Sequence, residues 1–82
     1  MAISLEKSTL LTIYYITLLD YQGGLLPVYV GRAIAGSKSG EAVWQIQKIT
    51  YDANNNPTSV LFANSTNSFV NVWDMRCQYN YG

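Results

Sequence analysis

The sequence predicts a small all-β protein, an antiparallel sandwich or barrel of five to six strands. Three observations lead to this class. β-Branched and aromatic residues gather in short segments, which is typical of strands. Turn-forming clusters recur roughly every 8–15 residues, as in small sandwiches and barrels, and no segment sustains a helical period. The chain has 82 residues, so we expect a single β domain over 1–82.

The first expected element is a long strand over 9–19, preceded by an N-terminal arm over 1–8. Apolar side chains occur at both odd and even positions of 10–19, whereas a strand with one covered face should alternate. A domain of this size has little with which to cover a second face. We therefore expect this strand at a contact between subunits, with an interface formed by Leu11, Ile13, Tyr15 and Leu19.

The middle of the chain predicts a second strand, a long loop and a hairpin. The second strand begins at Pro27 and ends at Val30, and the Gly- and Ser-rich stretch 31–40 is the loop. The third strand covers 41–51, and its apolar residues change parity, which indicates either a bulge or a helical turn at its start. The Asn-rich turn 52–57 and a return strand over 58–63 complete a hairpin.

The last part of the chain predicts a turn at 64–68, a short irregular or helical piece at 69–74, and a final strand at 75–81 where apolar and polar residues alternate. In an extended segment Asp74 and Arg76 share a face, so an ion pair between them is expected. Cys77 is expected to be a small, at least half-buried side chain of this strand. The candidate core consists of Trp44, Ile46, Phe62 and Trp73.

Composition argues against an enzyme. There is no His, a single Cys, and five carboxylates that stand apart from one another, so we expect no catalytic residue, no metal site and no cofactor site. The stretch 31–39 approaches a phosphate-binding loop but has the wrong spacing. Charges cancel to zero, which predicts no attraction to nucleic acid or to an anionic membrane.

The same weak charge favours self-association. Charged residues make up 12 % of the chain, about half of the ~25 % typical of globular domains. A nearly neutral surface lacks the like-charge repulsion that keeps copies of a protein apart. A homo-oligomer is therefore the expected state.

From Val28 onward the order of features resembles a family of short bacteriophage virion proteins. The resemblance rests on Tyr29-Val30-Gly31 with Ala33, Gly36-Ser37, Trp44-x-Ile46-x-x-Ile49-x-Tyr51, an Asn-rich turn, Phe62-Ala63, Phe69-x-x-x-Trp73-Asp74-x-Arg76 and Tyr79. It implies a structural subunit associated with the tail, a fibre or the head, whose partners are other virion proteins. Such a protein would be made in the host cytoplasm, which suits a chain with one cysteine, and would reside in the virion.

The leading hypothesis is thus a non-enzymatic structural subunit that assembles with itself and docks on larger tail, fibre or capsid proteins. The alternative is a glycan-binding module at a fibre tip that takes part in host attachment. Aromatic rings flanked by amides bind sugars, and Trp44, Trp73 and Tyr51 are the first candidates for such a platform.

Overall fold

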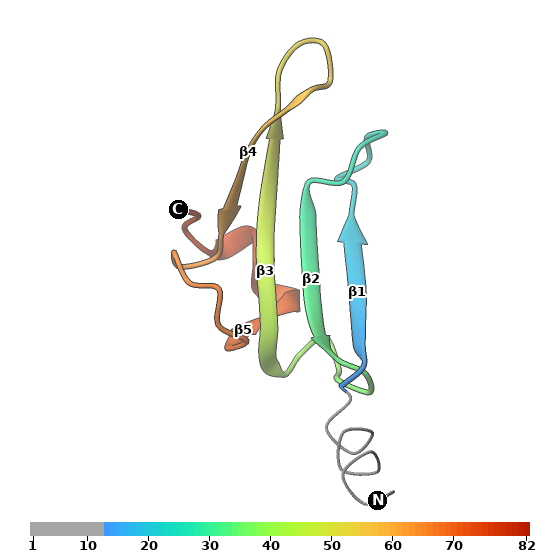
Figure 1. Cartoon of the computed structure of the whole chain (residues 1–82), viewed down its shortest axis with the longest axis vertical. Coiled ribbons are helices and arrows are strands. Elements are labelled where there is room, and N and C mark those ends of the chain that lie inside the picture. The colour runs from blue at the N-terminus through green and yellow to red at the C-terminus, as the bar shows by residue number, and fades with distance from the viewer. Residues whose placement is uncertain (1–12) are drawn as a thin grey trace, which may run out of the picture.

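The computed structural model describes residues 13–82 and is organised around an open, four-stranded antiparallel sheet (Figure 1). The strands follow one another across the sheet in chain order, and a short fifth strand pairs with the third. A single 3-10 helix follows the fifth strand. The elements are β1 (Tyr15–Asp20), β2 (Tyr29–Ile34), β3 (Ala42–Tyr51), β4 (Pro57–Phe62), β5 (Asn71–Val72) and η1 (Trp73–Gln78). The predicted small antiparallel all-β class is confirmed, with five strands.

The ten-residue strand β3 is the centre of the sheet because three other strands pair with it. β2 lies along one edge. The other edge is shared: β4 pairs with Gln47 to Tyr51, and β5 pairs with Ala42 and Trp44. The register shifts near both ends of β3, between Ala42 and Trp44 and between Thr50 and Tyr51. The second layer is thus the chain that follows β5, which turns across one face of the sheet.

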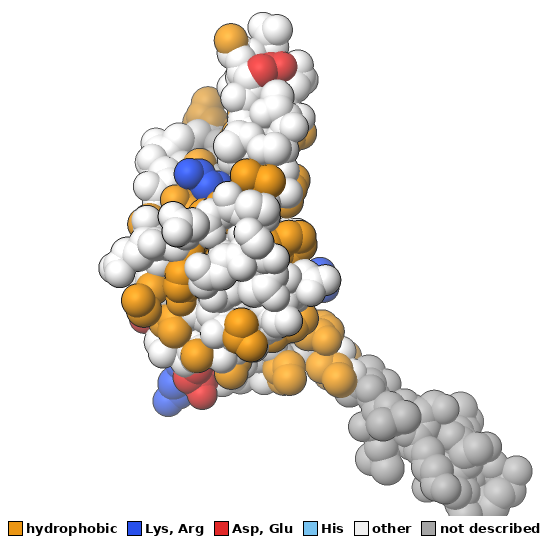
Figure 2. Space-filling model, turned by 90° about the vertical axis from the view of Figure 1, so that its left-hand side faces the viewer, with side chains coloured by type: hydrophobic (Ala, Val, Ile, Leu, Met, Phe, Trp, Pro, Cys, Tyr) orange, Lys and Arg blue, Asp and Glu red, His pale blue; other side chains and the backbone are white. Residues whose placement is uncertain are grey.

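The two faces of the sheet differ in how they are covered. Cα partners across an antiparallel pair carry their side chains on the same face, so the pairing of Gly31 with Ile46 and of Leu18 with Gly31 defines one face. We call it the covered face, because the segment 71–82 lies on it (Figure 1). The opposite side, the open face, carries Tyr15 and Leu19 of β1, Ile34 of β2 and Val60 of β4. Viewed from the side of β4 and the C-terminal segment, the molecule shows many apolar side chains and few charged ones (Figure 2).

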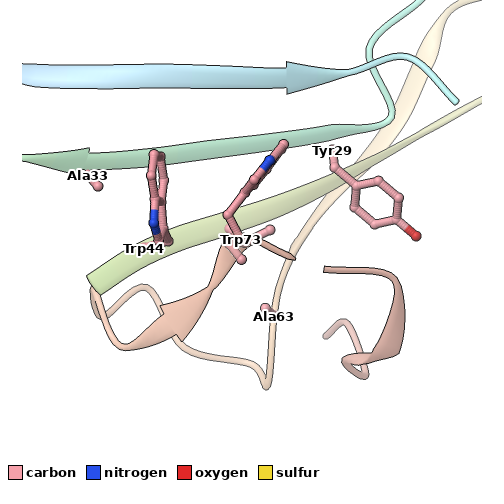
Figure 3. Packing of buried hydrophobic residues seen from close by; sticks show 6 residues of the cluster. Tyr29, Ala33, Trp44, Ala63 and Trp73 are labelled. Atoms are coloured by element: carbon pink, nitrogen blue, oxygen red, sulfur yellow. The ribbon is translucent and has the colours of Figure 1, made fainter. Parts of the chain in front are cut away.

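The core lies between the covered face and the C-terminal segment (Figure 3). Trp44 and Ile46 are fully buried, and the ring of Trp73 packs 6.1 Å from that of Trp44. The indole N–H of Trp44 donates to the carbonyl of Lys38 at 2.9 Å, so its one polar atom is satisfied. Three of the four candidate core residues therefore lie in the cluster. Phe62 is half-buried and lies outside it, since it pairs with Gln47 on the open face.

The prediction that the loop begins at Gly31 was wrong. β2 continues through Gly31 to Ile34, and the loop begins at Ala35. Gly31 is buried against the rings of Trp73 and Trp44, where a Cβ atom would lie 2.6 Å from Cζ3 of Trp73. This glycine is thus a site of close packing within a strand rather than a loop residue.

The predicted strand over 75–81 was also wrong. Residues 73–78 form η1, and only Tyr81 makes an isolated bridge, to Ala63. Two side-chain bonds hold the turn: Arg76 Nη1 donates to the carbonyl of Trp73 at 3.1 Å, and the Tyr81 hydroxyl donates to the carbonyl of Arg76 at 2.7 Å. Tyr79 adds a third tie, because its hydroxyl accepts the N–H of Val72. The helical piece expected at 69–74 therefore lies four residues later than predicted.

Gly and Asn residues stand in the turns between the strands. Gln22 and Gly23 both have positive φ, and the N–H of Gly24 donates to the carbonyl of Tyr21 at 2.9 Å, which is the geometry of a tight hairpin turn. The hairpin of β3 and β4 is closed by Asp52, whose carboxylate accepts the N–H groups of Asn54 and Asn56.

Candidate functional site

The open face is the first part of the candidate site. Its apolar side chains are exposed: Ile34 by 56 %, Val60 and Leu19 by 49 % and Tyr15 by 45 %. Polar side chains lie among them, since Thr17 pairs with Arg32 across β1 and β2. Single exposed apolar residues are ordinary, but several on one sheet face are typical of an interaction surface.

An apolar cavity of about 270 Å³ lies at one end of the open face. Phe69, from the segment before β5, folds against the start of β1, where its ring lies 5.7 Å from that of Tyr15. The guanidinium of Arg32 lies over the ring of Tyr15, 5.5 Å from the ring centre. The lining residues are Tyr15, Ile34, Ser37, Val43 and Phe69.

The outer edge of β1 is the second part of the candidate site. Within residues 13–82 no strand pairs with β1 on the side away from β2. The carbonyls of Tyr14 and Asp20 accept the N–H groups of Ala35 and Val28, at 2.9 and 2.8 Å. Because backbone groups alternate in direction along an antiparallel strand, those of Tyr15, Thr17 and Leu19 are directed to the free edge.

Three of the four predicted interface residues are exposed in the structure. Ile13, Tyr15 and Leu19 are all exposed, and the last two belong to both the open face and β1. Leu11, like the predicted arm over 1–8 and the start of the predicted strand 9–19, lies outside the described residues. The described strand is Tyr15–Asp20.

An ion pair joins β1 to η1, with a partner that the sequence did not indicate. Arg76 Nε lies 2.7 Å from Asp20 Oδ2, and this is the only salt bridge within residues 13–82. The Asp74–Arg76 pair was wrong because 73–78 is helical, so residues two apart point in different directions. Asp74 accepts the hydroxyl of Ser39 at 3.2 Å instead.

The surroundings of Asp20 favour its ionised form. The backbone N–H of Gln22 donates to Asp20 Oδ1 at 2.9 Å, and Arg76 and the Gln22 amide donate to Oδ2. These donors hold the pKa of Asp20 below its ordinary value, the Gln22 N–H most strongly and Arg76 next. The Arg76 guanidinium also lies 4.5 Å from the ring centre of Trp73. Arg76 thus ties the covering segment to the core and to β1 at once.

A tyrosine cluster lies on the covered face near the C-terminus. The rings of Tyr29 and Tyr81 are 5.6 Å apart, and Lys48 Nζ lies 5.8 and 5.9 Å from their centres. Burial raises the pKa of both tyrosines. The hydroxyl of Tyr81 is used in the bond to Arg76, so this cluster serves to fix the C-terminal segment.

The aromatic residues proposed for a sugar platform are engaged elsewhere. Trp44 is fully buried and Trp73 is 7 % exposed, so neither indole offers a face to a ligand. Tyr51 is half-buried, and its hydroxyl donates to the carbonyl of Pro27 at 2.6 Å. These three residues therefore do not form a glycan-binding surface.

Other chemical groups of the described chain are isolated. No three His, Cys, Asp or Glu side chains come together among residues 13–82 as they would around a metal ion. Cys77 is exposed on η1, so the expectation of a half-buried strand residue was wrong. None of the helical structure in 13–82 is both long and apolar enough to span a membrane.

Comparisons with known proteins return no relative: no protein-family model, curated protein or solved structure matches this chain.

Sequence reasoning missed the open-face residues that come from outside β1. Ile34 falls in the predicted loop, Val43 and Val60 are not among the predicted site residues, and Phe69 is named only in the family pattern. The signal that could have revealed the open face is the alternation of β2, in which Val30 and Ile34 point to the face opposite that of the buried Tyr29 and Ala33. It was hidden by Gly31, which interrupts the apolar pattern.

Proposed function

We propose that this protein is a non-enzymatic structural subunit of a bacteriophage virion, which assembles with itself and docks on larger tail, fibre or capsid proteins. The observation that carries the proposal is the open face. Among residues 13–82 the one covering layer, the segment 71–82, lies on the opposite face, and the exposed apolar side chains therefore remain for contacts with other chains.

Burial of this surface would favour assembly. Each square ångström of apolar surface removed from water contributes roughly 25 cal/mol, and the four exposed side chains of the open face come from three strands that hold them in fixed positions. Few charged groups oppose contact, because the chain has five basic and five acidic residues. The surface is thus suited to a permanent rather than an electrostatically steered association.

The cavity beside Phe69 supports docking on a larger protein. Its volume of about 270 Å³ is just below the ~300 Å³ at which small-molecule sites begin. A space of this size, lined by Tyr15, Ile34, Val43 and Phe69, fits one large apolar side chain. We propose that a larger virion protein supplies that side chain. The assignment to a virion rests on the family resemblance of the segment from Val28 onward.

Two measurements test the proposal. Purified wild-type chain, studied by light scattering over a range of concentrations, should have a mass above that of one 9.2 kDa copy. Mass spectrometry of washed particles of the phage that encodes the chain should detect it in fixed proportion to the major structural proteins. A monomer at every concentration, or a protein absent from washed particles, would contradict the proposal.

A further inference from the structure

We infer that two copies of this chain pair through β1, antiparallel and about a two-fold axis at Thr17, so that two four-stranded sheets become one continuous sheet. This inference rests on the proposed self-assembly. It names the partner, which is a second copy, and the register in which the two copies meet.

In the part of the chain that the structure describes, residues 13–82, the edge of β1 lacks the features with which proteins protect a free strand. Such edges usually carry Pro, Lys or a bulge, or are covered by a loop. β1 reads Tyr-Ile-Thr-Leu-Leu-Asp and pairs with β2 without a register shift. Its one charged residue, Asp20, is the last of the strand and is held by Arg76. The strand is therefore open to pairing with another strand.

The backbone is poised for that pairing. The carbonyls of Tyr14 and Asp20 are bonded toward β2, and the alternation of an antiparallel ladder directs the N–H and C=O groups of Tyr15, Thr17 and Leu19 outward. In a two-fold pair centred on Thr17, these outward groups face each other, since Thr17 meets the second copy's Thr17 and Tyr15 meets the second copy's Leu19.

The side chains match in the same register. On the open face the exposed Tyr15 lies opposite the second copy's exposed Leu19, and the reverse pair repeats the contact. On the covered face Ile16 lies opposite the second copy's Leu18, both of which pack against the core. Aromatic–aliphatic pairs and Thr–Thr pairs stabilise antiparallel sheets. The pairing thus brings the exposed apolar side chains of β1 into contact on the open face, where each shields part of the other from water.

Neighbouring registers fit less well. An axis at Leu18 would place the Asp20 carboxylate opposite the second copy's Ile16, and an axis at Leu19 would place it opposite Leu18. An axis at Ile16 would set the Thr17 hydroxyl against the second copy's Tyr15. The axis at Thr17 places Asp20 opposite the exposed Tyr14 of the second copy, outside the pairs of Tyr15 with Leu19 and of Ile16 with Leu18, and leaves its bond to Arg76 in place.

Disulfide trapping tests the register directly. In a Cys77→Ser background, which removes the chain's one thiol, Thr17→Cys should form a covalent dimer under mild oxidation. Directly opposed residues in a hydrogen-bonded antiparallel pair have Cα atoms about 5.5 Å apart, within the span of a disulfide. The matched control is Ala53→Cys, which is also exposed but lies in the turn between β3 and β4, away from the open face; it should remain uncrosslinked.

A charge exchange gives a second, independent readout. Thr17→Lys should convert the wild-type dimer to a monomer, because two lysines would meet at the axis beside Arg32 of each copy. Adding an equal amount of Thr17→Glu should restore a dimer of one chain of each kind. Ala53→Lys, in the exposed turn between β3 and β4, should leave the mass of the dimer unchanged.

The outcomes separate the two proposals. A wild-type monomer at every concentration would overturn both self-assembly and the pairing through β1. A stable oligomer in which Thr17→Cys forms no cross-link and Thr17→Lys leaves the mass unchanged would overturn the pairing alone. Equal cross-linking by Thr17→Cys and Ala53→Cys would also overturn it, since collision rather than a fixed register would then account for the bond.

Discussion

The indole of Trp73 lies directly on the backbone of Gly31, in the middle of β2. The ring occupies the space that any side chain at position 31 would need, and Cε3 of Trp44 borders the same space at 3.2 Å from that Cβ position. The contact is what allows the C-terminal segment to approach the sheet closely enough to exclude water from the core. The covered face thus depends on a residue without a side chain.

Gly31→Ala should therefore destabilise the protein. A methyl group at this position must displace one of two large rings in a packed core, and overpacking of this kind costs about 1–3 kcal/mol. The measurement is the free energy of unfolding from urea titration followed by circular dichroism. Gly24→Ala is the control, because its nearest atom is the Tyr21 carbonyl oxygen at 3.4 Å, an ordinary contact. Equal losses in the two variants would contradict the close packing at Gly31.

Asp20→Asn should weaken the attachment of η1 to β1. The variant removes the negative charge that accepts the Arg76 guanidinium and the Gln22 N–H. We expect a loss of about 1 kcal/mol at neutral pH, the order of a partly exposed charged hydrogen bond. Asp74→Asn is the matched control and should leave the Arg76 pair intact, since Asp74 bonds to Ser39. A larger loss for Asp74→Asn than for Asp20→Asn would show that Arg76 pairs with Asp74 after all.

The pH dependence of the free energy of unfolding should also report on the Asp20 carboxylate. The pKa of Asp20 is lowered in the folded chain, so its contribution is complete above the unfolded pKa of about 3.9 and is lost as the pH falls through the lower folded value. Urea titrations should show that the free energy of unfolding of the wild type falls between neutral pH and pH 3. The fall should be smaller in Asp20→Asn. The remaining fall is assigned to Asp52, whose pKa is lowered by the N–H groups of Asn56 and Asn54. An unchanged pH profile in Asp20→Asn would refute the assignment.

Ser65→Gly should stabilise the turn that follows β4. Asn64 and Ser65 both have left-handed backbone angles, with φ of 53° and 56°, and this conformation costs a residue with a side chain roughly 1–2 kcal/mol. Glycine avoids that cost but gains freedom when unfolded, so we expect a net gain of about 0.5–1 kcal/mol. Thermal unfolding measures it as a rise in Tm, and Ser65→Ala, which keeps the Cβ, should show no gain.

The sequence was sufficient to predict the class, the hairpin of β3 and β4, and most of the core. Period, turn residues and large apolar side chains are local features, and β3, β4 and the positions of Trp44 and Trp73 depend on them directly. Two errors share one cause. Gly31 suggested a loop, and the alternation after Asp74 suggested a strand. Both segments instead take the conformation that lets Trp73 stack on β2, which is a contact between distant parts of the chain.

The candidate site was predicted only where one segment contributes to it. The two-sided apolar pattern of β1 is visible in the sequence, and it placed Ile13, Tyr15 and Leu19 on an exposed surface. The cavity was not predictable, because Tyr15 and Phe69 are 54 positions apart and meet only through the fold. The partner of Arg76 was missed for the same reason, since Asp20 and Arg76 are far apart in the chain and meet only through the fold.

Ile34→Ser should separate assembly from folding. Ile34 is 56 % exposed and lines the cavity, so the change should lower the free energy of unfolding of the isolated chain by less than about 0.5 kcal/mol, as surface substitutions usually do. It should weaken docking, because it removes apolar area and places a hydroxyl in an apolar cavity. The measurement is the amount of variant recovered with washed phage particles, relative to wild type. Ile46→Ala is the comparison: this fully buried residue should cost 2–5 kcal/mol in stability. Wild-type recovery of the Ile34→Ser variant would show that the cavity does not hold the docking contact.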